Sequence, residues 1–292
     1  MRVPFRLNRA GWPALPLPRR IALPDPRDLL SSERIAAPDA FAARSSLFVL
    51  RGTTRSTRPG RHRQGDALLA RALRGSSPVV LDVGAADGST SLDLIAALGD
   101  RFAAYYVTDR TLSLRARTDD RGRAFLYDAE DGTCVLIATP RWVVYPAAEV
   151  RAGWLRRALP WLRGGIPPFD PAYPEVSLVQ PRLREVARRD ARVIVRAYNV
   201  LEPWDGPAPT VVKIANLLNR AFLPDAAIRR ATRNLFRALP RGGLLLVIDN
   251  RVVDGRPVEK ASLLERDEGG FRHVESVNGG TEILDLALRR GG

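Results

Sequence analysis

Hydrophobic residues between positions 78 and 250 fall in short continuous runs separated by stretches with a helical period. Runs of five or six residues bounded by Gly, Asp or Asn are typical of parallel strands covered on both faces. Helical spacing follows the first run and returns near 225–238. Strands that alternate with helices predict an α/β fold with a mostly parallel sheet. The predicted strands are 79–83, 103–108, 192–197, 210–215 and 243–248.

Two regions interrupt this alternation. After Asp109 about eighty residues precede the next predicted strand, more than one crossover helix needs, so we expect an inserted subdomain at about 110–178. The C-terminal tail predicts a closing antiparallel hairpin around Asn278-Gly279-Gly280. Within the insertion we predict a hairpin formed by 124–127 and 134–138, and a helix at 150–159 near Trp154 and Trp161. The predicted strands of the closing hairpin are 270–277 and 281–288.

The positive charge is concentrated before the predicted sheet. Residues 1–63 carry 13 arginines against four acidic residues, whereas the whole chain has a net charge of +14. Six prolines within 1–27 disfavour regular structure there, so we interpret 1–63 as a basic, partly disordered leader and 64–292 as the main domain. A GC-rich genome explains the arginine excess without a binding partner, and we favour this explanation. The alternative is an acidic partner such as nucleic acid or a membrane surface.

Composition excludes several classes of site. With Cys134 as its one cysteine and only His62 and His273 as histidines, the chain offers no disulfide pair and no cysteine- or histidine-based metal site, so no metal is expected. No run of 18 apolar residues occurs, which argues against a membrane-spanning helix. We therefore expect a cytoplasmic protein.

The residues that end the predicted strands indicate a ligand site. The first strand ends in the small-residue turn 84–88, directly after Asp82. The next three strands end at Asp109, Asn199 and Asn216. Since open α/β sheets bind ligands beyond the carboxyl ends of their strands, we expect these side chains around one ligand. Asp109 suits ribose hydroxyls, Asn199 an adenine edge, and Asn216 the reactive group.

With these motifs the sequence resembles the class I S-adenosylmethionine-dependent methyltransferases over roughly 78–288, apart from the insertion. The segment from Asp82 to Gly88 is similar to their acidic-glycine motif, and Leu239-Pro240-Arg241-Gly242-Gly243 to a turn before a later strand, with proline and arginine exchanged. The closing hairpin suits their antiparallel last strand. Segments 198–203 and 216–223 look most like the catalytic domain of chemotaxis-receptor methyltransferases, although no helical amino-terminal domain is recognisable.

The resemblance implies a Rossmann-like class I methyltransferase fold and S-adenosyl-L-methionine as cofactor. Asp109 is expected to hold the ribose, and Asn216, the candidate nearest to the chemistry, to lie beside the methyl donor. No catalytic base is evident, and the acceptor, a small molecule or a protein, is not implied; nor is the oligomeric state. The implied cofactor-binding residues are Asp82, Gly84, Ala85, Ala86, Gly88, Asp109, Asn199, Val200 and Asn216.

Two rival functions remain. One is a non-catalytic S-adenosylmethionine-binding regulatory or interaction protein, since no acidic Asp-Pro-Pro-Tyr-type motif follows the fourth strand. The other is a nicotinamide-dependent oxidoreductase, disfavoured because Ala86 and Asp87 break the Gly-x-Gly-x-x-Gly spacing. Among the remaining polar residues, we expect His62 to be solvated, unless the leader folds over the active site, and His273 to lie on the surface. Lys213, inside a predicted strand, has no explanation from the sequence.

Overall fold

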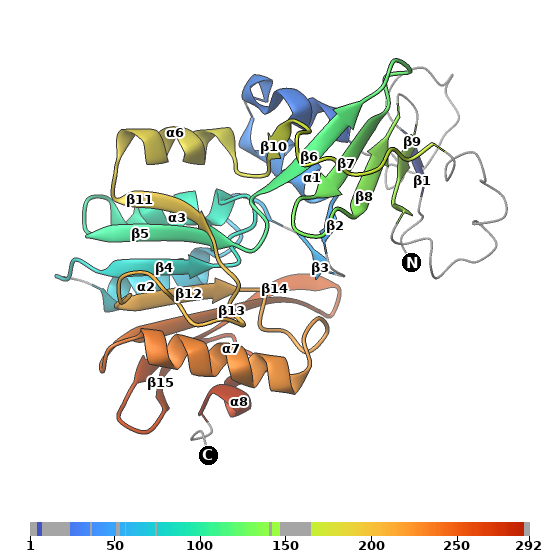
Figure 1. Cartoon of the computed structure of the whole chain (residues 1–292). Helices are drawn as coiled ribbons and strands as arrows, with labels where there is room; N and C mark the ends of the chain where they lie inside the picture. Colours follow the sequence, from blue (N-terminus) through green and yellow to red (C-terminus); the bar gives the residue numbers. More distant parts are fainter. Residues whose placement is uncertain are drawn as a thin grey trace. The chain divides into compact units, whose positions relative to one another are not determined.

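The computed structural model describes residues 5–7, 24–35, 37–50, 53–55, 57–73, 75–139, 142–146 and 165–288. The chain divides into two compact units. Unit 1 consists of Met1–Ser56 and Thr111–Pro181, and unit 2 of Thr57–Arg110 and Arg182–Gly292. The described residues of each unit form their own main sheet (Figure 1).

Unit 2 is built on a seven-stranded sheet in the order β11-β5-β4-β12-β13-β14-β15. Its first five strands are parallel, and in chain order they follow the sequence 3-2-1-4-5 of doubly wound sheets. The order therefore reverses between β4 and β12. The strands are β4 (Val79–Val83), β5 (Ala104–Asp109), β11 (Val193–Ala197), β12 (Val211–Ala215), β13 (Leu244–Val253), β14 (Arg256–Arg266) and β15 (Phe271–Val277).

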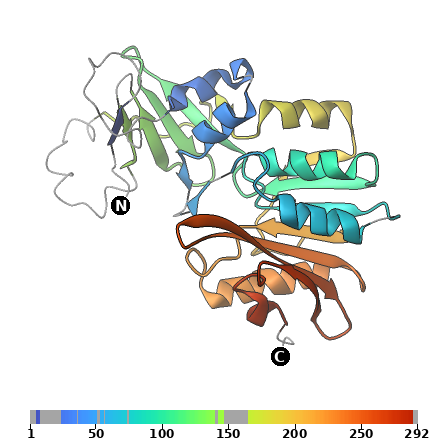
Figure 2. The ribbon, with the colours of Figure 1, turned by 180° about the vertical axis from the view of Figure 1, so that it is seen from behind.

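Helices cover both faces of this sheet, as Figures 1 and 2 show from opposite sides. The helix α7 lies on one face, and α2 and α3 lie on the other. The helices of unit 2 are α2 (Arg63–Ala72), α3 (Ser89–Leu98), α6 (Pro181–Arg189, of which Pro181 belongs to unit 1), α7 (Asp225–Ala238) and α8 (Leu284–Leu288). The predicted fold class, a Rossmann-like α/β sheet with an antiparallel C-terminal end, is confirmed.

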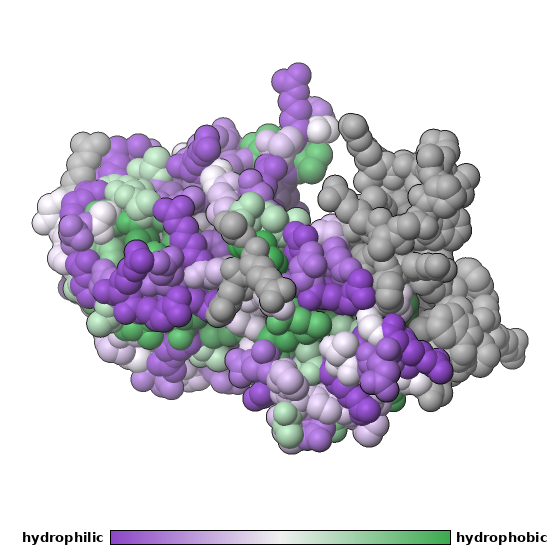
Figure 3. Space-filling view, turned by 90° about the horizontal axis from the view of Figure 1, so that it is seen from above, coloured by the Kyte–Doolittle hydropathy of each residue, from purple (hydrophilic) through white to green (hydrophobic). Residues whose placement is uncertain are grey.

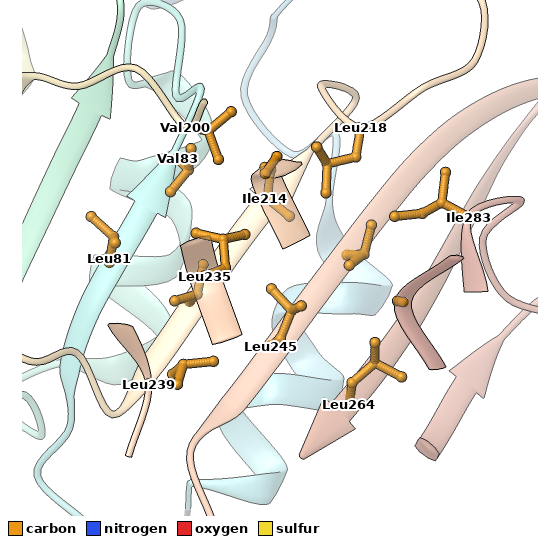
Figure 4. Close-up of a cluster of buried hydrophobic side chains, with 14 of the residues drawn as sticks. Leu81, Val83, Val200, Ile214, Leu218, Leu235, Leu239, Leu245, Leu264 and Ile283 are labelled. Carbon is orange, nitrogen blue, oxygen red and sulfur yellow. The ribbon is translucent and has the colours of Figure 1, made fainter. Parts of the chain in front are cut away.

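The α7 face of the sheet is packed with aliphatic side chains. Alternate residues of β4, β12 and β13 point to this face, as expected for the period of two in a strand. Ile228, Ala231 and Leu235 of α7 cover them at helical spacing and are fully buried. Figure 4 shows part of this cluster, including Leu81, Val83, Ile214, Leu235, Leu245 and Leu264.

The C-terminal end of the sheet differs from the prediction. The strand β13 continues to Val253, five residues further than predicted, because it turns at Asp254-Gly255 and pairs along its whole length with β14. The predicted strand 270–277 is present as β15. The predicted partner strand 281–288 is wrong: it contains α8, whose Leu286 and Ala287 are buried in the α7 core. The antiparallel hairpin is therefore formed by β14 and β15.

Unit 1 has an antiparallel six-stranded sheet in the order β1-β9-β8-β7-β6-β10. The predicted hairpin of 124–127 and 134–138 is present as β7 and β8. The predicted helix at 150–159, with Trp154 and nearby Trp161, lies outside the described residues. The strands are β1 (Phe5–Leu7), β6 (Ser113–Thr118), β7 (Ala124–Asp128), β8 (Cys134–Ala138), β9 (Trp142–Val144) and β10 (Glu175–Ser177), with β2 (Val49–Leu50) and β3 (Thr53–Thr54) paired separately.

Part of the predicted leader belongs to the core of unit 1. It forms the 3₁₀ helix η1 (Pro26–Arg34) and the helix α1 (Pro38–Ser45). Leu29, Phe41 and Phe48 are almost fully buried in one cluster with residues of β6, β7 and β8. Hydrophobic burial thus joins the leader to the inserted segment, although about sixty residues of chain separate Phe48 from β6.

The face drawn in Figure 3 is largely hydrophilic, with smaller hydrophobic areas between the polar ones. In the part of the chain that the structure describes, no helix combines the length and the apolar composition needed to cross a bilayer.

Candidate functional site

The loop between β4 and α3 lies where the strand order reverses, the place at which open α/β sheets bind ligands. Its backbone is left-handed at alternate positions, with φ of +70° at Gly84, +56° at Ala86 and +81° at Gly88. A Cβ at position 88 would lie 2.1 Å from Leu183 Cδ2, and together with the positive φ this favours glycine. Ala86 adopts the same conformation at a cost of about 1–2 kcal/mol, and such strain is concentrated at functional sites.

The carboxylate of Asp109 is tied to this loop. Asp109 ends β5, and its Oδ2 accepts a hydrogen bond of 2.9 Å from the backbone N–H of Ala86. The carbonyl of the preceding Thr108 accepts from the N–H of Ala85 at 2.9 Å. The structure therefore brings together the predicted glycine-rich turn and the predicted acidic strand end on one side of the strand-order reversal.

Asn216 lies on the other side of the reversal, directly after β12, and is also left-handed with φ of +56°. Its Oδ1 accepts from the backbone N–H of Asn250 at 2.7 Å. Its Nδ2 lies 3.0 Å from Asn250 Oδ1 and 3.1 Å from His62 Nε2. Asn250 and His62 were not among the predicted site residues.

His62 is buried, with 4% of its surface exposed, so the prediction that it is solvated is wrong. It directly precedes α2, which packs closely on the sheet because Gly65 lies against Ile248. Glu259 of β14 fixes the same turn by accepting from the N–H groups of Gln64 and Gly65 at 3.1 and 2.7 Å. These contacts of α2 carry His62 to the end of β12.

The electrostatic surroundings keep the His62 ring neutral. Burial lowers its pKa well below 6.5, and the positive charges of Lys213 and Arg61 lower the pKa further. The Nδ1 atom of His62 is buried and makes no hydrogen bond to any described residue. A buried donor or acceptor without a protein partner is rare, which makes this nitrogen a candidate contact for a ligand.

Asp82 lies below the loop in a buried polar network. Its Oδ2 accepts hydrogen bonds from Ser91 Oγ at 2.8 Å and from Tyr105 OH at 2.9 Å. The neighbouring strand places Lys213 beside it in register. The structure therefore shows that Asp82 ties β4 to α3 and β5. Its implied part in cofactor binding stays a prediction.

Lys213 is explained by the same network. The side chain is fully buried, and its Nζ lies 2.7 Å from Asp66 Oδ1 of α2 and donates to the carbonyl of Thr90 at 3.2 Å. Desolvation raises the pKa of Asp66 to about 6, against the opposing charge of Lys213. The attraction of Asp66 and Asp82 outweighs burial and raises the pKa of Lys213, so the lysine is charged.

Asn199 and Val200 follow β11, the outer parallel strand. Asn199 Oδ1 accepts from the N–H of Leu201 at 3.2 Å, and its Nδ2 donates to Glu202 Oε1 at 3.2 Å, so this amide stabilises its own turn. The side chain of Val200 is buried in the α7 core (Figure 4). The contact of Asn199 with adenine and the implied contact of Val200 with the cofactor stay predictions.

The remaining sequence-based expectations concern surface and metal chemistry. His273 lies on β15 and is exposed, as predicted. Among the described residues, no group of three His, Cys, Asp or Glu side chains is arranged to hold a metal ion.

Comparisons with known proteins give structural likenesses only. No family model matches the chain, and no curated protein matches its sequence. The N-methyltransferase NodS from Bradyrhizobium japonicum WM9 aligns at 14% identity and a TM-score of 0.34, over 65% of this chain and 68% of NodS. CalS10 from Micromonospora echinaspora, an amino pentose methyltransferase solved with bound S-adenosylmethionine, aligns at 15% identity and a TM-score of 0.32, over 74% of this chain and 68% of CalS10.

The YcgJ protein from Bacillus subtilis aligns at 15% identity and a TM-score of 0.32. The alignment covers 65% of this chain, which spans about half, 52%, of YcgJ. Solved methyltransferases are thus among the chains to which this one is similar.

Proposed function

We propose that this chain is an S-adenosylmethionine-dependent methyltransferase that acts on an unidentified acceptor. The observation that carries the proposal is the pair of features on either side of the strand-order reversal. On one side Asp109 holds a left-handed, small-residue loop through Ala86. On the other side Asn216 joins a buried histidine whose Nδ1 has no partner among the described residues. The resemblance to class I methyltransferases supplies the roles.

The residues present fit the cofactor that this family uses. Gly84 and Gly88 adopt positive φ where the chain turns, and their missing Cβ atoms leave room for the side chains of Leu217 and Leu183. We assign the backbone of this loop to the methionine part of the cofactor. Asp109, at the end of β5, is suited to accept hydrogen bonds from ribose hydroxyls. Asn199 and Val200 are assigned to the adenine. Asp82 stabilises the loop by accepting a hydrogen bond from Ser91, which follows the loop. When bound, the cofactor supplies an electrophilic methyl group on a sulfonium.

The contribution of the chain is orientation. Methyl transfer is an in-line displacement, so its rate depends mainly on the alignment of donor and acceptor. Asn216 is held by Asn250 through its oxygen and presents its NH₂ group beside His62. We assign this cluster to the acceptor side of the site. The finer similarity to chemotaxis-receptor methyltransferases and the cytoplasmic location remain predictions.

Calorimetry with S-adenosylhomocysteine tests the cofactor class, with NADH as the control ligand. We expect binding of S-adenosylhomocysteine alone. Asp109→Ala removes a hydrogen bond to a charged group and should weaken binding by about tenfold or more. The matched control is Asp100→Ala. Asp100 is a fully exposed carboxylate that precedes β5, so it lies near the amino end of the strand whose carboxyl end is Asp109. Unchanged affinity in Asp109→Ala would show that the ribose assignment is wrong.

Binding alone does not separate an enzyme from a regulatory protein that binds the same cofactor. Transfer of a labelled methyl group from S-adenosylmethionine to molecules of a cell extract makes that distinction. We expect labelled product with the wild type and much less with Asp109→Ala. Tight binding without any product in extracts of several kinds would favour the non-catalytic alternative.

A further inference from the structure

The hydrogen bonds around Asn216 fix which way its amide points. The backbone N–H of Asn250 can only donate, and it lies 2.7 Å from Asn216 Oδ1. The NH₂ group of Asn216 therefore faces Asn250 Oδ1 at 3.0 Å and His62 Nε2 at 3.1 Å. Because an amide NH₂ has no acceptor function, His62 Nε2 has to accept.

This arrangement selects one tautomer of His62. A neutral imidazole carries its proton on one nitrogen, and with Nε2 as acceptor that nitrogen is Nδ1. A second proton is opposed by burial and by the positive charges of Lys213 and Arg61, which together outweigh the opposite effect of the Asn250 side chain. His62 therefore presents a buried Nδ1–H group that has no acceptor among the described residues.

An unpartnered N–H in this position is suited to an oxygen with negative charge. Leaving a buried donor unsatisfied costs free energy that a ligand oxygen would recover. Lys213 and Arg61 make the surroundings of the ring positive, and this favours an anion over a neutral oxygen. Three carboxylates of this region already have partners: Asp66 pairs with Lys213 at 2.7 Å, Asp249 pairs with Arg251 at 2.5 Å, and Glu259 accepts from the N–H groups of Gln64 and Gly65.

We propose that the Nδ1–H of His62 binds an anionic oxygen, a carboxylate or a phosphate, of the acceptor substrate. The proposal rests on the proposed methyltransferase function and adds the chemical class of the acceptor to it. It also assigns His62 a binding role rather than the role of a base. To take a proton at Nδ1, the ring would need its other proton on Nε2, where the NH₂ group of Asn216 faces it.

Nitrogen NMR of the histidine side chains tests the tautomer directly. The chain has only two histidines, and His273→Gln removes the exposed one, so the signals of His62 are assigned without ambiguity. We expect a protonated Nδ1 and an unprotonated Nε2 at neutral pH. A protonated Nε2 would overturn the proposal, because His62 would then present an acceptor to the ligand.

Titration with acetate and with inorganic phosphate, on protein saturated with S-adenosylhomocysteine, tests the anion site. We expect the Nδ1–H signal of His62 to shift with at least one of the two anions in a saturable way. A response to acetate alone indicates a carboxylate acceptor, and a response to phosphate alone indicates a phosphorylated one. No response to either anion would overturn the proposal.

Two substitutions of His62 separate its two nitrogens. The amide of Asn reaches the position of Nδ1, whereas the amide of Gln reaches that of Nε2. We expect His62→Asn to retain anion binding and His62→Gln to weaken it by about tenfold. In both variants the NMR signal of the Asn250 backbone amide reports anion binding. Equal loss in both variants, together with a folded spectrum, would contradict a donor at Nδ1.

S-adenosylhomocysteine affinity, measured by calorimetry, keeps this proposal distinct from the proposed function. We expect both His62 variants to bind it as the wild type does. If the wild type does not bind S-adenosylhomocysteine, the proposed methyltransferase function fails. The tautomer of His62 and its response to anions, measured without S-adenosylhomocysteine, then still decide the role of His62. If it binds but no anion does, only the acceptor proposal fails.

Discussion

The two faces of the unit 2 sheet are built from opposite kinds of side chain. On the α7 face, buried residues from six strands and two helices form one hydrophobic cluster, with Leu81, Ile214 and Leu235 completely buried. On the face of α2 and α3, Asp82, Lys213 and Tyr105 are equally buried but are linked by hydrogen bonds and charge. Alternation along the same strands produces both faces.

The comparison shows which face determines the geometry of the site. Hydrophobic contacts on the α7 face are non-directional and tolerate changes of shape that preserve volume. The polar network has fixed partners: Asp82 precedes the left-handed loop, while Ser91 and Thr90 follow it. Lys213 and Asp82 therefore hold both ends of the loop. We infer that the α7 face supplies stability and that the opposite face supplies stability together with the loop conformation.

Lys213→Met is expected to have the largest effect. It leaves Asp66 and Asp82 buried without their shared cation, which should lower the free energy of unfolding by about 3–5 kcal/mol. S-adenosylhomocysteine affinity should fall as well, because the loop loses a support. Urea unfolding and calorimetry measure the two effects. The double variant Lys213→Met/Asp66→Leu should regain much of the stability; a double variant as unstable as the single one would show that unpaired charge is not the cause.

Leu235→Ala examines the α7 face in the same way. Leu235 is fully buried in the middle of α7, so truncation should cost about 2–5 kcal/mol of unfolding free energy. At temperatures where the variant stays folded, its affinity for S-adenosylhomocysteine should match that of the wild type. A loss of affinity as large as in Lys213→Met would remove the functional difference between the faces.

The parallel part of the fold is the part that local sequence predicts best. Each parallel strand is a short apolar run that ends in Gly, Asp or Asn, and this signal does not depend on distant residues. The strand β14 lacks it, because Pro257, Glu259 and Lys260 interrupt the run. Its pairing depends on β13 instead. In unit 1, β6 alternates buried Leu114 and Ala116 with arginines. This period of two is short and lies within a long inserted segment, so the sequence does not predict a strand there.

The candidate site was predictable where strand ends meet and unpredictable where a helix brings a residue from elsewhere. Asp109 and Ala86 end adjacent parallel strands, so their contact follows from topology. His62 precedes the first of these strands by 17 residues and reaches Asn216 only through the packing of α2. The local sequence offers one sign of this role: His62 is one of only two histidines and directly precedes an amphipathic helix. Lys213 likewise needs its partner Asp66, which lies on that helix.

Tyr105→Phe is expected to have a smaller effect on the polar face. It removes one of the two hydroxyl groups that donate to Asp82 Oδ2 and leaves Ser91 in place, so it should cost about 1–3 kcal/mol of unfolding free energy. Tyr198→Phe is the matched control, since its hydroxyl donates only to the neutral carbonyl of Glu202 at the edge of the sheet. A larger loss in the control than in Tyr105→Phe would argue against a charge-based network.

The smallest effect concerns the dependence of stability on pH. Burial and nearby cations lower the pKa of His62 in the folded protein below its ordinary value of 6.5. As the pH falls below 6.5, the unfolded chain therefore binds a proton that the folded protein does not, and the folded state loses stability by at most about 1.4 kcal/mol per pH unit. Asp66, with its pKa raised to about 6, acts in the opposite direction between about pH 6 and 4.

The contribution of His62 is isolated by the difference between the wild type and His62→Gln, because Asp66 is common to both proteins. Urea unfolding at a series of pH values from 7.5 to 5 gives this difference. We expect the wild type to lose stability faster than the variant as the pH falls, with the two curves parallel above pH 7. Parallel curves at every pH would mean that His62 titrates as freely in the folded protein as in the unfolded chain. In that case the polar face does not keep the His62 ring neutral.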